Sequence, residues 1–331
     1  MLNALGKEAR SGMNSAVMQK RIRSVAVSVM RNILLISIAI IIIYPLFYML
    51  SMALRPIDQV WDPTVVWVPR SITFDNITAT IAYMKYWSVF WNSVAVTFIS
   101  SALTVASCAL AGYGFARFSF RFKELLFLMV IFTILVPPQT IIFPSYLNFW
   151  QFDFFGLGQL FRPFLGRPLT ISLVNTQFTM YLPAMFGNGI RSGLYIYIFR
   201  QFYRGLPKEM EDAAYIDGCG TFMTFVRIAI PNSMLTIVTV FLFSVVWYWN
   251  DYYFTVIYMN AANTVSTALA ALPALFRGLT GVGGDVVKFD AIQTSVMIQS
   301  GCLLAITPVI LLFAVMKRFF VQGIEATGLV E

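Results

Sequence analysis

The chain has 331 residues, of which 59% are hydrophobic and 11% are charged, and its formal net charge is +8. A water-soluble domain carries about a quarter of its residues as charged side chains, so this composition excludes an ordinary soluble protein. The sequence contains no histidine, and its three cysteines are widely spaced. Histidine-based catalysis, histidine metal ligation and a disulfide framework are therefore excluded as well.

Six apolar stretches are long enough to cross a membrane, which takes about 20 residues. Pro137 and Pro138 interrupt the third, where we expect either a kink at a gate or a bend needed for packing. Three glycines and Arg191 interrupt the fourth, the least regular of the six. The sequence predicts an all-α integral membrane protein with six transmembrane helices, at about Ile33 to Leu54, Val89 to Phe115, Leu125 to Leu147, Phe178 to Phe199, Met234 to Tyr258 and Ile292 to Val315.

The basic residues predict the direction of these helices. If both termini are cytoplasmic, 15 of the Lys and Arg side chains lie in cytoplasmic segments, 7 lie in outer segments and Arg191 lies within a span. This asymmetry agrees with the positive-inside rule. The basic residues form short clusters at helix ends, so we expect them to contact anionic lipid headgroups of the bilayer and no nucleic acid.

This topology divides the chain into five parts. We expect a cytoplasmic arm at 1–32, a first transmembrane helix at 33–54, an extracytoplasmic loop at 55–88, a transmembrane core at 89–320 and a cytoplasmic tail at 321–331. The arm alternates charged and apolar residues, which predicts a short helix at the membrane surface, with a regulatory element as the alternative. Within the core, the outer segment 148–177 is rich in Phe and Gly and is long enough to fold partly on the outer surface.

A cytoplasmic loop, 206–231, has the features of two short helices joined by a sharp turn. Pro207 lies at a position that helix starts favour. Three acidic residues follow it, where negative charge meets the positive end of the helix dipole. Two alanines then form a smooth patch that a partner surface can approach closely, and Gly218 can adopt the positive φ that ends a helix. The pattern of this segment therefore predicts a helix-turn-helix that docks on a partner.

The spacing within this loop is distinctive. Asp212-Ala213-Ala214 is followed after three residues by Gly218, and after nine more by Ile228-Ala229-Ile230-Pro231. This resembles the EAA loop of ABC importer permeases, which has Glu-Ala-Ala, Gly and Ile-x-Leu-Pro at the same intervals. Asp212 replaces the usual Glu, which keeps the charge but shortens its reach by one methylene, and Ile230 replaces Leu.

Three other segments resemble the carbohydrate-uptake, maltose-type branch of that family. They are Ala111-Gly112-Tyr113-Gly114-Phe115-Ala116-Arg117-Phe118, Trp249-Asn250-Asp251 and Phe320-Val321-Gln322-Gly323. Together with the loop, the resemblance extends over roughly Asn92 to Gly323. It implies a type-1 permease fold in the bacterial cytoplasmic membrane and a role in ATP-driven, binding-protein-dependent import of oligosaccharides or other sugars.

The resemblance also implies partners. These are a second permease subunit in a heterodimer, two cytoplasmic ATPase subunits and an extracellular solute-binding protein. The chain has no Gly-x-x-x-x-Gly-Lys-Ser/Thr phosphate loop, so we expect ATP and Mg on the ATPase, and no cofactor, metal or catalytic residue on this chain. The residues that the resemblance assigns to ATPase coupling are Glu209, Glu211, Asp212, Ala213, Ala214, Gly218, Ile228 and Pro231.

Polar residues within the spans are candidates for the translocation path, because polar groups inside a membrane are expensive and usually functional. Alternatively, each one holds neighbouring helices together by hydrogen bonds. Arg191 lies deep within its span and Asp251 is the only acidic residue within any span, so we hypothesise that these two side chains pair. The candidates are Asn92, Arg191, Asn250, Asp251, Gln293 and Gln299.

Other functions stay open on the sequence alone. An ABC permease for another solute class, such as peptides or metals, shares the coupling loop. An ion-driven secondary transporter predicts intramembrane carboxylates and an inverted repeat, but one acidic residue and no such repeat are found. A membrane enzyme needs a polar cluster near the bilayer surface, and the sequence assembles none.

Overall fold

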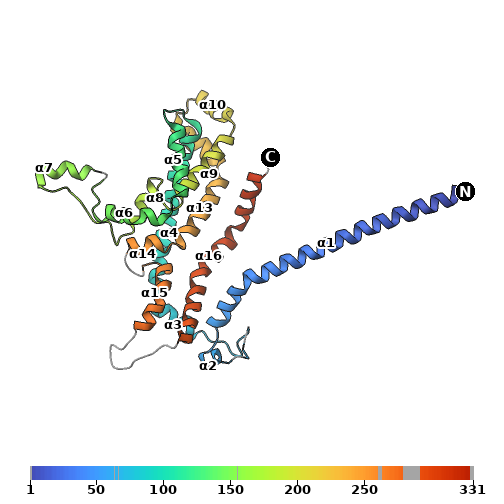
Figure 1. Ribbon diagram of the computed structural model, residues 1–331. Helices are drawn as coiled ribbons and strands as arrows, with labels where there is room; N and C mark the ends of the chain where they lie inside the picture. The colour runs from blue at the N-terminus through green and yellow to red at the C-terminus, as the bar shows by residue number, and fades with distance from the viewer. Residues whose placement is uncertain are drawn as a thin grey trace. The chain divides into compact units, whose positions relative to one another are not determined.

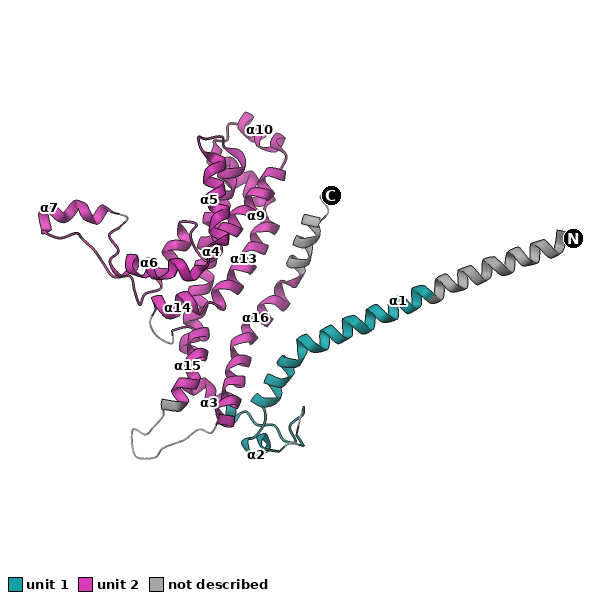
Figure 2. Ribbon diagram, in the orientation of Figure 1, with its two compact units in different colours: residues 1–76 teal, residues 77–331 magenta. Residues whose placement is uncertain are grey.

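The computed structural model describes the backbone of residues 2–62, 64–65, 67–154, 156–259, 263–278 and 291–328. It describes side chains over 23–62, 64–65, 67–154, 156–259, 263–276 and 291–317. The side chains of the tail 321–331 therefore lie outside the described residues, as do those of residues 1–22 in the arm. Residues 1–76 and 77–331 form two compact units (Figure 2), and each is described by itself.

The first unit is dominated by one long helix, α1 (Leu2–Ala53), of 52 residues. Its part from Arg23 to Ala53 is long and apolar enough to cross a membrane. Aliphatic side chains such as Ile41, which is 72% exposed, cover this stretch and suit contact with lipid. The arm is helical, as predicted, but its backbone continues unbroken into the first span, so it does not form a short helix of its own. After α2 (Ile57–Val60), Asn76 donates to the carbonyls of Ala53 (3.2 Å) and Arg55 (2.8 Å), which ties the loop back to the helix end.

The second unit is built around α4 (Tyr86–Arg117), against which α8 (Phe178–Met185), α9 (Ser192–Gly205) and α13 (Met234–Trp249) pack. It begins within α3 (Asp75–Tyr83). The other helices are α5 (Lys123–Leu135), α6 (Pro138–Trp150), η1 (Leu157–Phe161), α7 (Arg162–Leu165), α10 (Lys208–Ile216), α11 (Thr221–Thr224), η2 (Phe225–Ala229), α12 (Ile230–Asn232), α14 (Tyr253–Tyr258), α15 (Val265–Gly278) and α16 (Ala291–Gly328). Within this unit, α10 and α15 lie at opposite ends (Figure 1).

The contact between α4 and α9 is the most extensive one between helices of the second unit. Tyr195, Phe199 and Tyr203 are buried on α9 at intervals of four residues, which places them on one face of the helix. Gly112 of α4 lies directly against the Cβ of Phe199, so a side chain at position 112 has no room. Small residues of this kind let membrane helices approach closely when no hydrophobic force drives their association.

Several predicted spans are broken. Three helices, within α1, α4 and α16, are long and apolar enough to cross a membrane in the part of the chain that the structure describes, or up to five if each of two bent pairs is one span. The interruption predicted at Pro137 and Pro138 is confirmed: α5 and α6 meet there at 104°, so the third predicted span is not one continuous helix. Proline lacks the amide hydrogen that continues a helix and restricts the residue before it, so the chain turns there.

The fourth and fifth predicted spans are also not single helices. Residues 186–191 separate α8 from α9, and residues 250–252 separate α13 from α14. The first break coincides with the glycines that made this stretch irregular in the sequence. The second break places Asn250 and Asp251 beyond the end of α13, and not inside a continuous fifth helix as predicted.

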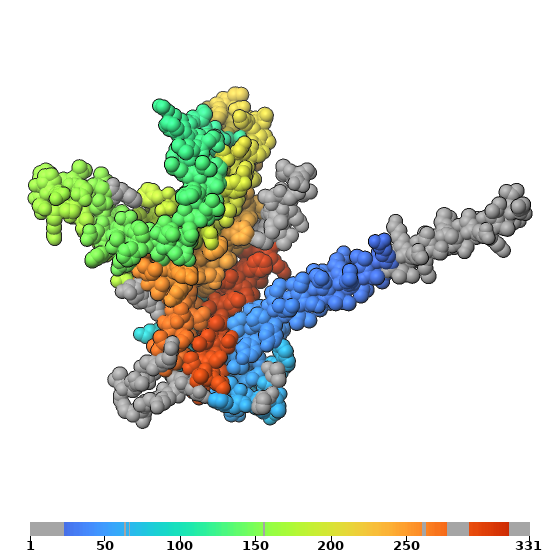
Figure 3. All heavy atoms as spheres, in the orientation of Figure 1, coloured from blue at the N-terminus to red at the C-terminus, as the bar shows by residue number. Residues whose placement is uncertain are grey.

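The segment that follows α6 folds on itself. Phe152 and Ile171 exchange backbone hydrogen bonds of 3.0 Å in each direction, which closes a loop carrying η1 and α7. Figure 3 shows this segment, in yellow-green, extending away from the rest of the second unit. Phe164 of α7, in this segment, is 87% exposed.

Candidate functional site

The segment 206–231 lies at the α10 end of the second unit and forms two helical pieces joined by a turn (Figure 1). Helix α10 begins at Lys208, with Pro207 as the residue before it. Gly218 has a φ of 83°, and the amides of Gly218 and Cys219 donate to the carbonyls of Tyr215 and Ala214. This left-handed turn is the one that the glycine predicted. The chain then continues through α11, η2 and α12.

A buried ion pair holds α10 against α4. The Nε of Arg117 lies 2.8 Å from the Oε1 of Glu211, and both side chains are 7% exposed. The same guanidinium donates from Nη2 to the carbonyl of Leu206 at 2.6 Å. One arginine at the end of α4 therefore fixes both the start of the loop and the first turn of α10 through charge-assisted hydrogen bonds.

An aromatic cluster holds the second half of the loop. The ring centroid of Phe225 lies 4.9 Å from that of Tyr113 on α4 and 6.3 Å from that of Tyr203 on α9. Phe225 and Ala229 are the buried residues of η2, a short π-helical piece, and such pieces occur often at functional sites. The Tyr203 hydroxyl lies 3.2 Å from the Ser233 hydroxyl, next to α12. The loop is thus packed on α4 and α9 along its length.

The outward face of α10 carries four residues at positions i, i+3, i+4 and i+7, which share one side of a helix. They are all exposed: Glu209, Asp212, Ala213 and Ile216. Ile216 is 87% exposed, and Phe222 beyond the turn is 69% exposed. These five residues are called the docking face below.

The structure separates residues that the sequence had grouped as one docking patch. Ala214 is buried at 6% exposure, while Ala213 beside it is exposed. Glu211 is likewise turned inward to Arg117. Ile228 is half-buried and Pro231 is exposed. Of the eight residues assigned to coupling, Glu211 and Ala214 face the protein interior, where they position α10.

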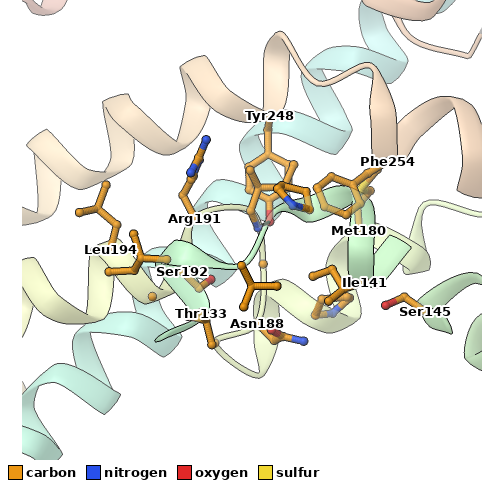
Figure 4. Close-up of a pocket in the computed structure, with 18 of the residues that line it drawn as sticks. Thr133, Ile141, Ser145, Met180, Asn188, Arg191, Ser192, Leu194, Tyr248 and Phe254 are labelled. Atoms are coloured by element: carbon orange, nitrogen blue, oxygen red, sulfur yellow. Dashed lines mark hydrogen bonds between the residues drawn. The ribbon is translucent and has the colours of Figure 1, made fainter. Parts of the chain in front are cut away.

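A cavity of about 220 Å³ lies where α8 and α9 are interrupted (Figure 4). Its polar side chains include Thr133 of α5, Ser145 of α6 and Asn188 of the break. The Tyr248 hydroxyl on α13 accepts a hydrogen bond from the Ile190 amide at 3.1 Å, and it lies 3.2 Å from the Thr104 hydroxyl of α4. Tyr248 therefore ties the irregular segment to two neighbouring helices.

Arg191 and Asp251 do not pair as hypothesised. The Arg191 guanidinium lies 4.3 Å from the centre of the Trp247 ring, on α13, and Figure 4 shows its side chain pointing away from Asn188. The Asp251 carboxylate instead accepts hydrogen bonds from the Thr255 amide (2.9 Å) and the Thr255 hydroxyl (2.8 Å) at the start of α14. Asp251 lies in the break between α13 and α14, and its carboxylate caps the first turn of α14.

A larger and more open cavity, of about 730 Å³, is lined by Asn92, Gln177 and Asn263, together with Tyr83, Lys85 and Trp91. Asn92 accepts a hydrogen bond from Gln177 and donates one to the backbone carbonyl of Asn263. The Tyr181 hydroxyl donates to Gln177 at 2.5 Å. These amides join α4, the start of α8 and the chain before α15. Their hydrogen bonds therefore favour the second possibility for Asn92, that it holds neighbouring helices together and does not serve the translocation path.

The other path candidates are more dispersed. Asn250 is exposed, and its amide nitrogen donates to the Val246 carbonyl at 2.8 Å. Gln293 and Gln299 are half-buried on α16 and line neither of these two cavities. Among the residues that the structure describes, no group of three His, Cys, Asp or Glu side chains could hold a metal ion.

The sequence did not identify three residues that contribute to these sites. They are Arg117, Trp247 and Tyr248, which meet partners far away in the chain. A basic residue at the end of an apolar span signals a membrane boundary and gives no partner. The two aromatic residues lie within an apolar stretch, where ordinary packing is the usual role.

Comparison with known proteins identifies the family. Residues 104–325 match the family model described as a binding-protein-dependent transport system inner membrane component. The chain is 29% identical over 300 residues to the probable ABC transporter permease protein YurM of Bacillus subtilis, covering 88% of this chain and 85% of that protein. It is 28% identical over 287 residues to the lactose transport system permease protein LacG of Rhizobium radiobacter, covering 86% of this chain and 90% of that one.

A solved structure shares the fold. It is a chain from the crystal structure of a bacterial ABC transporter involved in the import of the acidic polysaccharide alginate, with a TM-score of 0.68 and 18% identity, covering 88% of this chain and 96% of that chain. The family match covers most of the chain, including segment 206–231 and the residues of α4 and α9 against which it packs. This all-helical protein therefore belongs to the binding-protein-dependent transport system inner membrane components, as a multi-pass permease subunit of a bacterial ABC importer.

Proposed function

We propose that this permease imports oligosaccharides or other sugars by alternating access, and that segment 206–231 transmits closure of the ATPases to the membrane helices. The docking face carries the coupling part of the proposal. It presents an apolar centre, Ile216 and Phe222, beside the acidic residues Glu209 and Asp212. An exposed apolar patch with a polar rim is typical of a protein-binding surface.

The anchors beneath this face support a mechanical role. Glu211 is held by Arg117, and Phe225 is held by Tyr113 and Tyr203. A partner that moves α10 therefore also moves the ends of α4 and α9. A switch between two states requires contacts that differ between them, and the docking face is where ATPase closure would supply that difference.

The proposed topology keeps six spans with both ends in the cytoplasm. Here α8 and α9 together form one broken span, as do α5 with α6 and α13 with α14, alongside α1, α4 and α16. The distribution of Lys and Arg supports a cytoplasmic α10 end. We propose a heterodimer with a second permease, two ATPases that carry ATP and Mg, and an extracellular solute-binding protein.

The sugar assignment is supported by the relative that transports lactose, at 28% identity. The alternative within the family is another solute class. Uptake of labelled lactose by the assembled transporter, in parallel with a labelled dipeptide, separates the two. Uptake of the dipeptide with no uptake of lactose would favour the alternative.

Co-purification tests the coupling role directly. The variants A213R and I216R place a bulky charge on the docking face, and L160R makes the same kind of change at a residue of η1 that is 66% exposed. We expect the first two to lose the ATPase and L160R to retain it, with all three equally abundant in the membrane. Full ATPase retention by both A213R and I216R would overturn the coupling role of this face.

A further inference from the structure

One exposed face of α13 has an unusual composition for a membrane helix. Phe243 and Trp247 are four residues apart and share one side of α13, and Asn250, the residue that follows the end of the helix, comes three residues after Trp247. All three are exposed, with Trp247 at 43%. Arg191 from the break before α9 lies over the Trp247 ring and is itself exposed. The face therefore combines a cation, an indole and an amide.

Arg191 lies deep in the membrane in the proposed topology. The predicted fourth span ends at Phe199, eight residues after Arg191, which corresponds to about 12 Å at about 1.5 Å per residue. The hydrocarbon layer is about 30 Å thick. An exposed arginine at this depth is expensive if it faces lipid tails, so this side of α13 is better suited to a water-filled path.

No carboxylate among the described side chains forms an ion pair with this arginine. Arg191 takes part in none of the ion pairs of Arg70 with Asp62, Arg117 with Glu211 and Arg200 with Glu124. Asp251, the acidic residue of the nearby break, is occupied by hydrogen bonds from Thr255. The Arg191 charge is thus free of a carboxylate partner within the part of the protein that is described.

The stacking on Trp247 prepares the guanidinium for a ligand. A cation over an indole is held in place, and it keeps the hydrogen-bond donors along its edge available. Those donors match the two oxygens of a carboxylate in a bidentate arrangement. The Asn250 amide donates its nitrogen to Val246, which leaves its oxygen able to accept a bond from a sugar hydroxyl.

We infer that Arg191 and Trp247 line the translocation path and bind the carboxylate of an acidic sugar, so that the solute is a uronate-containing saccharide. This inference rests on the proposed sugar import and on the proposed topology. It concerns which sugar is carried, and it leaves the docking of the ATPase at the other end of α9 unaffected.

The test is uptake by the complete transporter, with both permeases, the ATPases and the binding protein in liposomes. The probes are labelled digalacturonate and labelled lactose. Charge-assisted hydrogen bonds contribute about 1.5–3 kcal/mol, so we expect R191Q to lower digalacturonate uptake about tenfold or more. R191K keeps the charge but loses the bidentate geometry, and should lie between R191Q and the unmodified protein. The control R167Q removes another exposed arginine, from the segment after α7, and should leave uptake unchanged.

Three results would overturn the inference. The first is uptake of lactose without uptake of digalacturonate, which leaves the sugar importer intact. The second is an equal loss of both sugars in R191Q, which indicates a structural or inter-subunit partner for Arg191. The third is uptake of neither sugar by the unmodified protein, which removes the carbohydrate assignment as well.

Discussion

Arg117 and Glu211 are 94 positions apart in the sequence, yet they form a 2.8 Å ion pair that is almost completely buried. Removing one partner of a buried pair leaves an uncompensated charge, which typically costs about 3–5 kcal/mol. We therefore expect E211Q to loosen segment 206–231 and, if this segment couples to the ATPases as proposed, to lower transport much more than it lowers the amount of protein in the membrane. Trypsin should then cleave faster after Lys208 and Arg227, at the two ends of the loop.

The matched control for this prediction is E209Q. Glu209 lies in the same first turn of α10 but is exposed, so its neutralisation should leave the rate of tryptic cleavage unchanged. The double variant R117Q/E211Q leaves no unpaired charge and should be more resistant to trypsin than either single variant. Equal cleavage rates in E211Q and the unmodified protein would show that the pair does not hold the loop.

Gly218 and Gly220 form a second natural comparison. A Cβ added at either position meets no atom within 4 Å, but Gly218 has a φ of 83° and Gly220 has a φ of −73°. A non-glycine residue in the left-handed region costs about 1–2 kcal/mol. We expect G218A to lower the thermal stability of the purified permease and its ATPase binding, with G220A neutral in both measurements.

Asparagine refines this comparison, because it tolerates the left-handed conformation better than alanine does. G218N should therefore recover part of the stability lost in G218A. If G218A and G220A behave alike, the turn does not depend on the backbone conformation of Gly218.

Gly112 tests the packing of α4 on α9. A Cβ at Gly112 would overlap Phe199, whereas one at Gly114 meets only Phe118, at 4.0 Å. Forcing extra atoms into a packed interface typically costs about 1–3 kcal/mol. We expect G112A to lower the midpoint of thermal unfolding in detergent, with G114A close to the unmodified protein. If G112A and G114A unfold at the same temperature, the interface of α4 and α9 accommodates an added methyl group at position 112 without loss of stability.

The sequence predicted those parts of the protein that depend on local chemistry. Composition and apolar length indicated a helical membrane protein, and Gly218 indicated the left-handed turn in the coupling loop. The breaks were only partly predictable. Pro137 and Pro138 predicted the break within the third span. The angle of 104° between α5 and α6 depends on what α6 packs against, and no local signal encodes that.

The candidate sites show the same division. The exposed side of α10 follows from helical periodicity once the start of the helix is known. The inward turn of Glu211 requires Arg117, which is distant in the chain and unremarkable as a single basic residue. The hypothesis of an Arg191 and Asp251 pair was wrong for a related reason. Opposite charges within spans suggested a contact, but the break after Trp249 supplied Asp251 with Thr255 as a nearer donor.

A double-mutant cycle tests this corrected assignment. Arg191 contacts Trp247, and Asp251 contacts Thr255, so the effects of R191Q and D251N on the free energy of unfolding should add within about 0.3–0.5 kcal/mol. D251N alone should destabilise the protein, because it removes a charged acceptor from two donors of Thr255. Denaturant titration of the purified permease in detergent measures the free energy of unfolding of each single variant and of the double variant.

The positive control in this experiment is the pair D251N and T255V. These residues share a 2.8 Å hydrogen bond, so their effects should deviate from additivity by about 0.5–3 kcal/mol. A coupling of that size between R191Q and D251N, with none between D251N and T255V, would restore the pair that the sequence suggested. Additivity of the first pair with coupling in the second instead leaves the Arg191 charge available to a solute, because the nearest intramembrane carboxylate is then engaged by α14.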